Sequence, residues 1–207
     1  MKKLFIMLCF VSAAITVDAQ DSTWGKKIFK QEFWIKLYLG SNYSNLAGDN
    51  DYNPVTGGLL GIEIPILKFS NYLGLGFGAD YSMQGGKYKS TDYIPGGNYG
   101  TSSATTRLNY LNFPLLLRYQ KARNGFFAEA GVQPGLLLSA KNKGATTTDI
   151  KDELKKFDVG VPLGIGYGFK NKIGIGLRIT PGLMNINKVE NLKNRNMVAS
   201  LRASYAL

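Results

Sequence analysis

Apolar residues alternate with small or polar residues, with a period of two, along most of the chain after residue 32. In the stretch YLGLGFGADYSM, for example, Leu73, Leu75 and Phe77 share one face, and glycines occupy the positions between them. This alternation indicates half-buried β-strands rather than helices. Eight segments carry the pattern, at residues 33–44, 58–67, 72–83, 111–119, 129–138, 157–167, 173–180 and 199–207.

The composition of the two strand faces decides which face points inward. If the apolar face were the interior of a soluble sandwich, glycine and small residues would have to form its outer surface. In a small transmembrane barrel the apolar face meets lipid, and the inner face must be small and polar because eight strands enclose only enough room for side chains. We therefore predict an all-β fold over residues 33–207, an eight-stranded antiparallel up-and-down transmembrane β-barrel.

Each of the eight segments places one ionisable residue on the glycine-rich face. A charge such as Arg or Lys at the lipid midplane costs roughly 2–4 kcal/mol, whereas opposite charges inside a barrel can pair. We predict a structural charge network inside the barrel. A catalytic role for Glu129 or Asp158 is a weaker alternative, because structural ion pairs perturb carboxylates in the same way as active sites do. The predicted network consists of Lys36, Glu63, Asp80, Arg118, Glu129, Asp158, Arg178 and Arg202.

Connections between the segments alternate in length. Three are hairpin-sized, at 68–71, 121–124 and 170–172, whereas the connections near 45–56, 84–106, 140–155 and 186–196 are longer. Outer-membrane barrels have short turns on the periplasmic side and longer loops outside, so we predict that both termini are periplasmic. The longest loop, 84–106, is expected to be mobile because it is rich in Gly, Ser and Thr.

Aromatic residues recur near the predicted membrane boundaries, as in the aromatic girdles of membrane barrels. The predicted periplasmic girdle consists of Phe33, Tyr119, Phe127, Tyr167 and Tyr205. The predicted outer girdle consists of Tyr43, Tyr81 and Phe157.

The first residues have the features of a secretory signal peptide. Lys2 and Lys3 precede an apolar run that ends in small residues, and we predict cleavage after Ala19. The run is shorter than the roughly 20 residues of a spanning helix, so a membrane anchor is the weaker alternative. The predicted organisation is thus a signal peptide at 1–19, a short periplasmic segment at 20–32 and the barrel at 33–207.

The residue types limit the chemistry that the mature chain can perform. The sequence has no His, and its single Cys, Cys9, lies in the predicted signal peptide, which excludes the usual zinc sites and thiol chemistry. The Gly-x-Gly stretches lack the strand–turn–helix context of nucleotide loops. We therefore expect no cofactor, no metal, and no nucleic acid partner.

The formal charge of +11 fits a soluble basic surface or, less strongly, a partner that bears phosphates. Lysines cluster in and beside the third long loop, where they could meet lipopolysaccharide, although Asp149, Asp152 and Glu153 dilute their charge. These lysines are Lys141, Lys143, Lys151, Lys155 and Lys156.

Three stretches, LNYLNFPLLLRYQ (108–120), FFAEAGVQPGLLLSAK (126–141) and KKFDVGVPLGIGYGF (155–169), together resemble the outer-membrane β-barrel family of Bacteroidetes that includes PorT-like proteins. The resemblance implies a Gram-negative outer-membrane location, biogenesis by the barrel assembly machinery and, for PorT-like members, a part in protein secretion. The chain departs from the family pattern at Asn112, where members often have Glu, and at Leu207, where a terminal Phe is usual.

Three classes of function remain open from the sequence. The preferred class is a non-enzymatic outer-membrane barrel with structural or interaction roles, in contact with lipid, lipopolysaccharide and a protein partner at its loops or periplasmic face. The second is an accessory of secretion. The third, an outer-membrane enzyme, is disfavoured because the histidine base of known outer-membrane hydrolases and acyltransferases is missing.

Overall fold

The computed structural model describes residues 35–48, 52–94, 98–121, 124–144, 146–188 and 193–207. All of them belong to Trp34–Leu207, one of the two compact units into which the chain divides. The predicted signal peptide with its cleavage after Ala19, the segment 20–32 and the girdle residue Phe33 lie outside the described residues.

The described residues form an all-β structure with a single short 3-10 helix. No helix among them is long and apolar enough to cross a membrane. The elements are β1 (Lys36–Gly48), β2 (Tyr52–Asn53), β3 (Val55–Lys68), β4 (Leu73–Ile94), β5 (Asn98–Asn112), β6 (Leu115–Gln120), β7 (Gly125–Lys143), β8 (Thr147–Asp149), η1 (Lys151–Glu153), β9 (Phe157–Gly160), β10 (Leu163–Gly168), β11 (Ile173–Pro181) and β12 (Asn194–Ala206).

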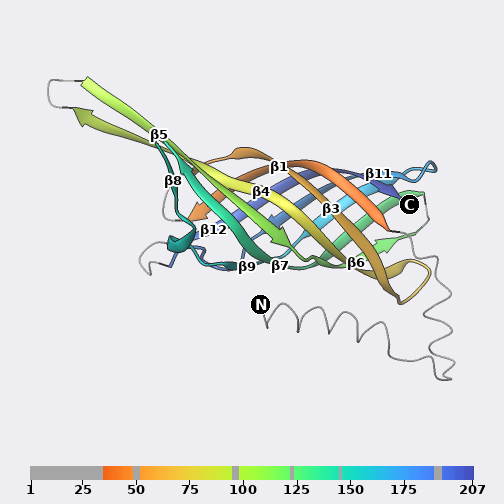
Figure 1. Cartoon of the computed structure of the whole chain (residues 1–207). Helices are drawn as coiled ribbons and strands as arrows, with labels where there is room; N and C mark the ends of the chain where they lie inside the picture. Colours follow the sequence, from red (N-terminus) through yellow and green to blue (C-terminus); the bar gives the residue numbers. More distant parts are fainter. Residues whose placement is uncertain (1–34, 49–51, 95–97, 122–123, 145, 189–192) are drawn as a thin grey trace. The chain divides into compact units, whose positions relative to one another are not determined.

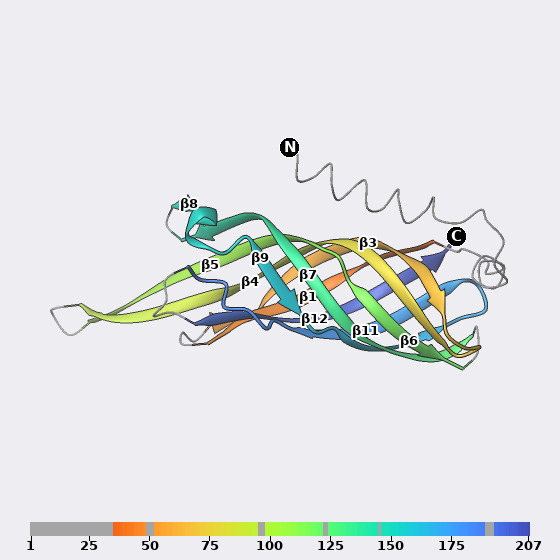
Figure 2. The same ribbon diagram turned by 90° about the horizontal axis from the view of Figure 1, so that it is seen from below.

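The strands form one antiparallel sheet that closes on itself. The sheet order is β10, β11, β12, β1, β3, β4, β5, β7 and β6, and β7 also pairs with β10. Figures 1 and 2 show these strands wound obliquely around a common axis. The first and last strands pair along their whole length, from Lys36 opposite Ala206 to Gly48 opposite Asn194. The antiparallel, up-and-down arrangement predicted from the sequence is therefore present.

The described part of the chain contains twelve strands instead of the eight that were predicted, and two prolines account for part of the difference. Pro114 separates β5 from β6 and Pro162 separates β9 from β10, because proline has no N–H to donate to the ladder. The backbone pairing nevertheless continues, since Gly78 N–H donates to the Pro114 carbonyl at 2.8 Å and Gly131 N–H donates to the Pro162 carbonyl at 3.0 Å. The short strands β2 and β8 lie in segments predicted to be loops.

The predicted mobile loop 84–106 is largely regular strand structure. β4 and β5 pair continuously from Asp80 opposite Asn112 to Ile94 opposite Asn98. Figure 1 shows this hairpin extending well beyond the neighbouring strands. The prediction of a loop was wrong here because it relied on the high Gly and Ser content and gave too little weight to the Thr and Tyr residues, which favour strands.

The two faces of the sheet differ as the alternation predicts. Large apolar side chains on the outer face are exposed, including Leu39 at 67%, Ile165 at 63% and Leu177 at 58%. The opposite face is buried and mostly polar, with Asn42, Asp80 and Arg178 all below 5% exposed.

The buried face is not polar throughout, which the sequence analysis did not anticipate. An apolar cluster lies at the end with the longer connections, and Tyr52 and Ile150 pack against it. The prediction failed because apolar runs such as GLLLS place leucines on both faces, and only the outward ones were considered. The cluster consists of Leu46, Leu108, Tyr110, Leu137, Ala140, Leu154 and Ile186.

Aromatic side chains are exposed near the short turns, with one correction to the predicted set. Tyr119, Tyr167 and Tyr205 lie on the outer face as expected. Phe127 instead points inward, and the Arg118 guanidinium lies 4.7 Å from the centre of its ring. Its neighbour Phe126 is the exposed residue, at 80%, because alternation that puts Glu129 inside must also put residue 127 inside.

Candidate functional site

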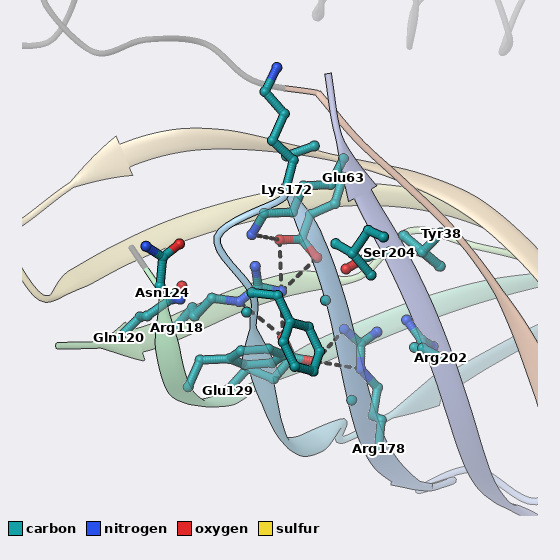
Figure 3. Close-up of a pocket in the computed structure, with 18 of the residues that line it drawn as sticks. Tyr38, Glu63, Arg118, Gln120, Asn124, Glu129, Lys172, Arg178, Arg202 and Ser204 are labelled. Atoms are coloured by element: carbon teal, nitrogen blue, oxygen red, sulfur yellow. Dashed lines mark hydrogen bonds and ion pairs between the residues drawn. The ribbon is translucent and has the colours of Figure 1, made fainter. Parts of the chain in front are cut away.

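The candidate site is the charged interior near the short turns, where the structure brings five of the eight predicted residues into one chain of ion pairs (Figure 3). Arg118 on β6 lies directly opposite Glu129 on β7, and its Nη2 is 2.6 Å from Glu129 Oε2. The same Nη2 lies 2.9 Å from Glu63 Oε1, and Lys36 Nζ lies 3.7 Å from that oxygen. Arg178 Nε donates to Glu129 Oε1 at 2.7 Å, and its Nη2 bonds the same oxygen.

Glycines let these side chains reach partners that are two strands away. β10 lies between β7 and β11, and its residue opposite both Glu129 and Arg178 is Gly164. A Cβ on Gly164 would lie 2.8 Å from Glu129 Oε1, so a larger residue would obstruct the contact. Gly76 on β4 likewise leaves room beside Glu63, which meets Arg118 across that strand.

Asp80 forms a second group deeper in the sheet. Tyr38 on β1 reaches across Gly61 on β3, and its hydroxyl donates to Asp80 Oδ2 at 3.0 Å. Asn112 donates to the other carboxylate oxygen at 2.8 Å. Arg202 Nη2 is 3.9 Å from Asp80 Oδ2, and its guanidinium lies over the Tyr38 ring at 4.9 Å. The Asp80 carboxylate is thus held mainly by hydrogen bonds.

Asp158 is the one predicted network residue that meets no cation within the described part of the chain. Its Oδ2 accepts a hydrogen bond of 2.7 Å from Asn196, whose amide also donates to the Tyr110 hydroxyl at 3.2 Å. Its Oδ1 accepts from the Val159 backbone N–H at 2.8 Å. The strand register places Gly135 opposite Asp158, so no basic side chain lies at this level on the neighbouring strand.

The carboxylate of Glu129 is fully engaged by its two arginine partners. Both oxygens of Glu129 accept from arginines, which leaves neither directed at an open space for proton transfer. The residues that the structure describes contain no group of three or more Asp, Glu, Cys or His side chains able to hold a metal ion.

Between this network and the short turns lies a cavity of about 410 Å³. Arg118, Arg178 and Arg202 line its inner part, and Lys170 and Lys172 of the β10–β11 turn line its mouth. Figure 3 shows the side chains of Glu63, Arg118, Glu129 and Arg178 grouped within this part of the interior, with Arg202 beside Arg178.

The sequence analysis did not identify the uncharged partners of these charges. Alternation placed Tyr38 and Asn112 on the inner face without giving them a role, and both contact Asp80. Phe127 was assigned to the outer face and Asn196 to a connection, although the parity of Glu129 and of Arg202 extends to these two residues.

The sequence matches the model of the outer membrane protein beta-barrel domain family over residues 19–188. No curated protein matches the sequence.

Among solved structures, Neisserial surface protein A is similar with a TM-score of 0.54 at 12% identity, covering 83% of this chain and 96% of that protein. Ail, the attachment invasion locus protein of Yersinia pestis, in complex with the heparin analogue sucrose octasulfate, gives 0.47 at 10% identity, covering 86% and 100%. OprG of Pseudomonas aeruginosa gives 0.42 at 12% identity, covering 84% and 95%.

Proposed function

Because the chain belongs to the outer membrane protein beta-barrel domain family, we propose that it is a non-enzymatic barrel with a filled, charged interior that presents its longer loops for structural or interaction roles. The family membership places the protein in the outer membrane. The observation that supports the filled barrel best is the division of the sheet into an exposed apolar face and a buried face on which five of the predicted charges form one chain of ion pairs. That division suits lipid outside and side chains inside.

In this proposal the twelve strands make up eight membrane-spanning segments. β5 and β6 together form one segment through Phe113 and Pro114, and β9 and β10 together form another through Val161 and Pro162. Backbone bonds from Phe113 N–H to the Pro134 carbonyl and from Val161 N–H to the Pro181 carbonyl keep both junctions in the sheet, at 2.8 and 3.0 Å. β2 and β8 belong to the loop end and cross nothing.

The short turns are proposed to face the periplasm, together with the N-terminal and C-terminal ends of the chain segment that forms the barrel. The first residue of β1 and the last residue of β12 pair with each other at this end, and the turns after β3 and β10 lie there too. The long β4–β5 hairpin and the β8 segment would then face outward.

Cysteine labelling tests this orientation, since Cys9 is the only cysteine in the sequence and lies in the predicted signal peptide. Thr148→Cys in β8 and Asn171→Cys in the β10–β11 turn would each be treated with a membrane-impermeant maleimide. We expect Thr148→Cys to react in intact cells and Asn171→Cys to react only after lysis. Reaction of Asn171→Cys alone in intact cells would reverse the orientation.

Electrophoresis of the outer-membrane fraction tests the barrel itself. A folded barrel is expected to migrate anomalously until it is boiled. Migration that is identical before and after boiling would contradict the proposal.

The proposed partners follow from location and charge. Lipid contacts the apolar face, the barrel assembly machinery acts during biogenesis, and lipopolysaccharide phosphates meet exposed lysines such as Lys143, Lys155 and Lys156 at the loop end. A protein partner would bind the loops or the periplasmic face.

A PorT-like accessory role in secretion is the second candidate. The three stretches that resemble that Bacteroidetes family lie on adjacent strands, because β7 pairs with β5, β6, β9 and β10. The residues that carry the resemblance therefore lie on one side of the barrel, as expected for a shared contact surface. A deletion strain that accumulates exported proteins in the periplasm would support this role, and normal secretion would exclude it.

A further inference from the structure

We propose that the cavity at the short-turn end binds a phosphate group, held between Arg178 and Arg202 and approached past Lys170 and Lys172. The proposal is independent of any partner at the loops.

Two buried guanidinium nitrogens lack partners in this cavity. Nη1 of Arg178 and Nη1 of Arg202 are buried and make no hydrogen bond. The two arginines come from neighbouring strands, β11 and β12, and Figure 3 shows their guanidinium groups next to each other. Buried polar groups in folded proteins are nearly always hydrogen-bonded, and both arginines line this cavity, so an acceptor bound there would satisfy these donors.

The charges that line this cavity also favour an anion. Its lining includes the guanidinium groups of Arg118, Arg178 and Arg202 but only the carboxylates of Glu63 and Glu129, whereas Asp158 lies further along the interior and does not line it. Arg202 is the least neutralised of the three arginines, since its only carboxylate partner is 3.9 Å away and already accepts hydrogen bonds from Tyr38 and Asn112. A buried cation that lacks close compensation is unfavourable, and an anion beside Arg202 would remove the excess.

The kind of anion follows from the donors. The unpaired Nη1 groups of the two arginines can each donate to an oxygen of a phosphate, and lysine ammonium groups add point charges. The side chains of Lys170 and Lys172 are exposed in the β10–β11 turn and line the mouth of the cavity. Their additional positive charge favours a dianionic phosphate over a singly charged carboxylate. The phosphate could be free, on a small monoester or on a lipid headgroup that ends in a phosphomonoester.

The test is calorimetric titration of the full mature chain, refolded in zwitterionic detergent, with sodium phosphate against sodium chloride of equal ionic strength. We expect saturable phosphate binding with a Kd near or below about 1 mM. Arg202→Gln should weaken it about tenfold, since the variant removes one guanidinium while Asp80 keeps its bonds from Tyr38 and Asn112. Arg195→Gln, exposed on the same strand at the loop end, is the matched control and should bind as the wild type does.

A second variant covers the case in which Arg202→Gln does not fold. Lys170→Gln combined with Lys172→Asn changes only the exposed turn, and Asn tolerates the positive φ of 66° at residue 172. This variant should also bind phosphate more weakly than the wild type.

A last arm identifies the source of the phosphate group. If a lipid headgroup fills the cavity, nanodiscs that contain phosphatidic acid, a phosphomonoester, should suppress phosphate binding relative to nanodiscs of phosphatidylcholine, whose phosphodiester carries a single charge, whereas equal binding would indicate a free phosphate. The proposal is overturned if phosphate gives no saturable signal, or if Arg195→Gln weakens binding as much as Arg202→Gln.

Discussion

Glu129 is the residue on which the interior charge network depends most. Its two carboxylate oxygens receive Arg118 from one side and Arg178 from the other, and its side chain is only 4% exposed. Arg178 is similarly buried, so neither charge can turn to water if its partner is removed. A charge stranded in this way costs far more than the intact pair contributes.

We expect Glu129→Leu to lower the free energy of unfolding by about 3–5 kcal/mol, because it leaves two arginines without their shared carboxylate. Urea unfolding of the barrel refolded in detergent measures the change. Glu153→Leu, in the exposed η1, serves as the control and should change it by less than about 0.5 kcal/mol. Equal stability of Glu129→Leu and the wild type would mean that the network contributes little.

The inward position of Phe127 requires a residue without a side chain at position 166 on the neighbouring strand. The Phe127 ring lies across β10, so that a Cβ on Gly166 would come within 2.3 Å of the ring Cζ and 2.5 Å of the Ile175 carbonyl oxygen. The ring has little freedom to move away because the Arg118 guanidinium stacks on it.

Gly166→Ala is therefore expected to destabilise the barrel by about 1–3 kcal/mol, the usual range for an overpacked interior. The measurement is again the urea midpoint in detergent. At Gly58 the nearest atom to an added Cβ is the Met83 sulfur at 3.9 Å, so Gly58→Ala should be nearly neutral. A neutral Gly166→Ala would show that Phe127 does not occupy the interior.

At this scale, the sequence predicted which face each charged residue occupies but not which partner it meets. Alternation placed Glu129 and Arg178 inside, whereas their contact depends on Gly164 lying opposite both of them. That coincidence requires the strand register, which period-two patterns do not contain. Asp158 shows the consequence, because an inward position alone did not bring it to a cation.

Among the strands, the β4–β5 hairpin stands apart from the wall of the barrel. Among the described residues, the backbone from Lys89 opposite Ser103 to Ile94 opposite Asn98 pairs between β4 and β5 alone. The attachments to other strands are closer to the barrel, where Tyr52 pairs with Tyr88 and Thr105 pairs with Lys143. The hairpin tip can therefore be shortened without breaking those attachments.

We expect a variant in which Asn-Gly replaces residues 90–102 to fold with unchanged stability. Lys89 and Ser103 already face each other across the hairpin, which is the spacing that a two-residue Asn-Gly turn closes. The urea midpoint and the electrophoretic shift on boiling measure the outcome. If the shortened chain fails to fold, the hairpin takes part in assembly as well as in presentation.

The strand elements were predictable to different degrees. Regular alternation located part of each long strand, and the predicted segments that contain Pro114 and Pro162 each correspond to two strands in the structure because the proline keeps its place in the alternation. The hairpin beyond Met83 was misread as a loop because the strand pairing there compensates for residues that individually disfavour strands. Composition alone does not report that pairing.

Viewed as a whole, the interior is obstructed at three successive levels. Near the short turns, Glu63, Arg118 and Glu129 bridge strands β3, β6 and β7. In the middle, the space beside Tyr110 and Asp158 amounts to about 20 Å³, enough for about one water molecule. At the end with the longer connections, the apolar cluster around Leu108 fills the interior of the barrel. These levels are stacked along one axis, so opening any one of them leaves the others closed.

Wild-type protein reconstituted into planar bilayers is consequently expected to give no stable openings of porin size, because a continuous water path would have to pass all three levels. The apolar level can be tested by Leu108→Ala, which removes a fully buried side chain of the cluster but leaves both polar levels intact. This variant should also remain closed. Its free energy of unfolding, measured with urea, should be about 2–5 kcal/mol lower than that of the wild type. A known porin measured in the same bilayers shows that insertion and recording work. Stable porin-sized openings of the wild type would mean that the ion pairs around Glu129 separate in the membrane, and the filled interior would then have to be replaced by a gated channel.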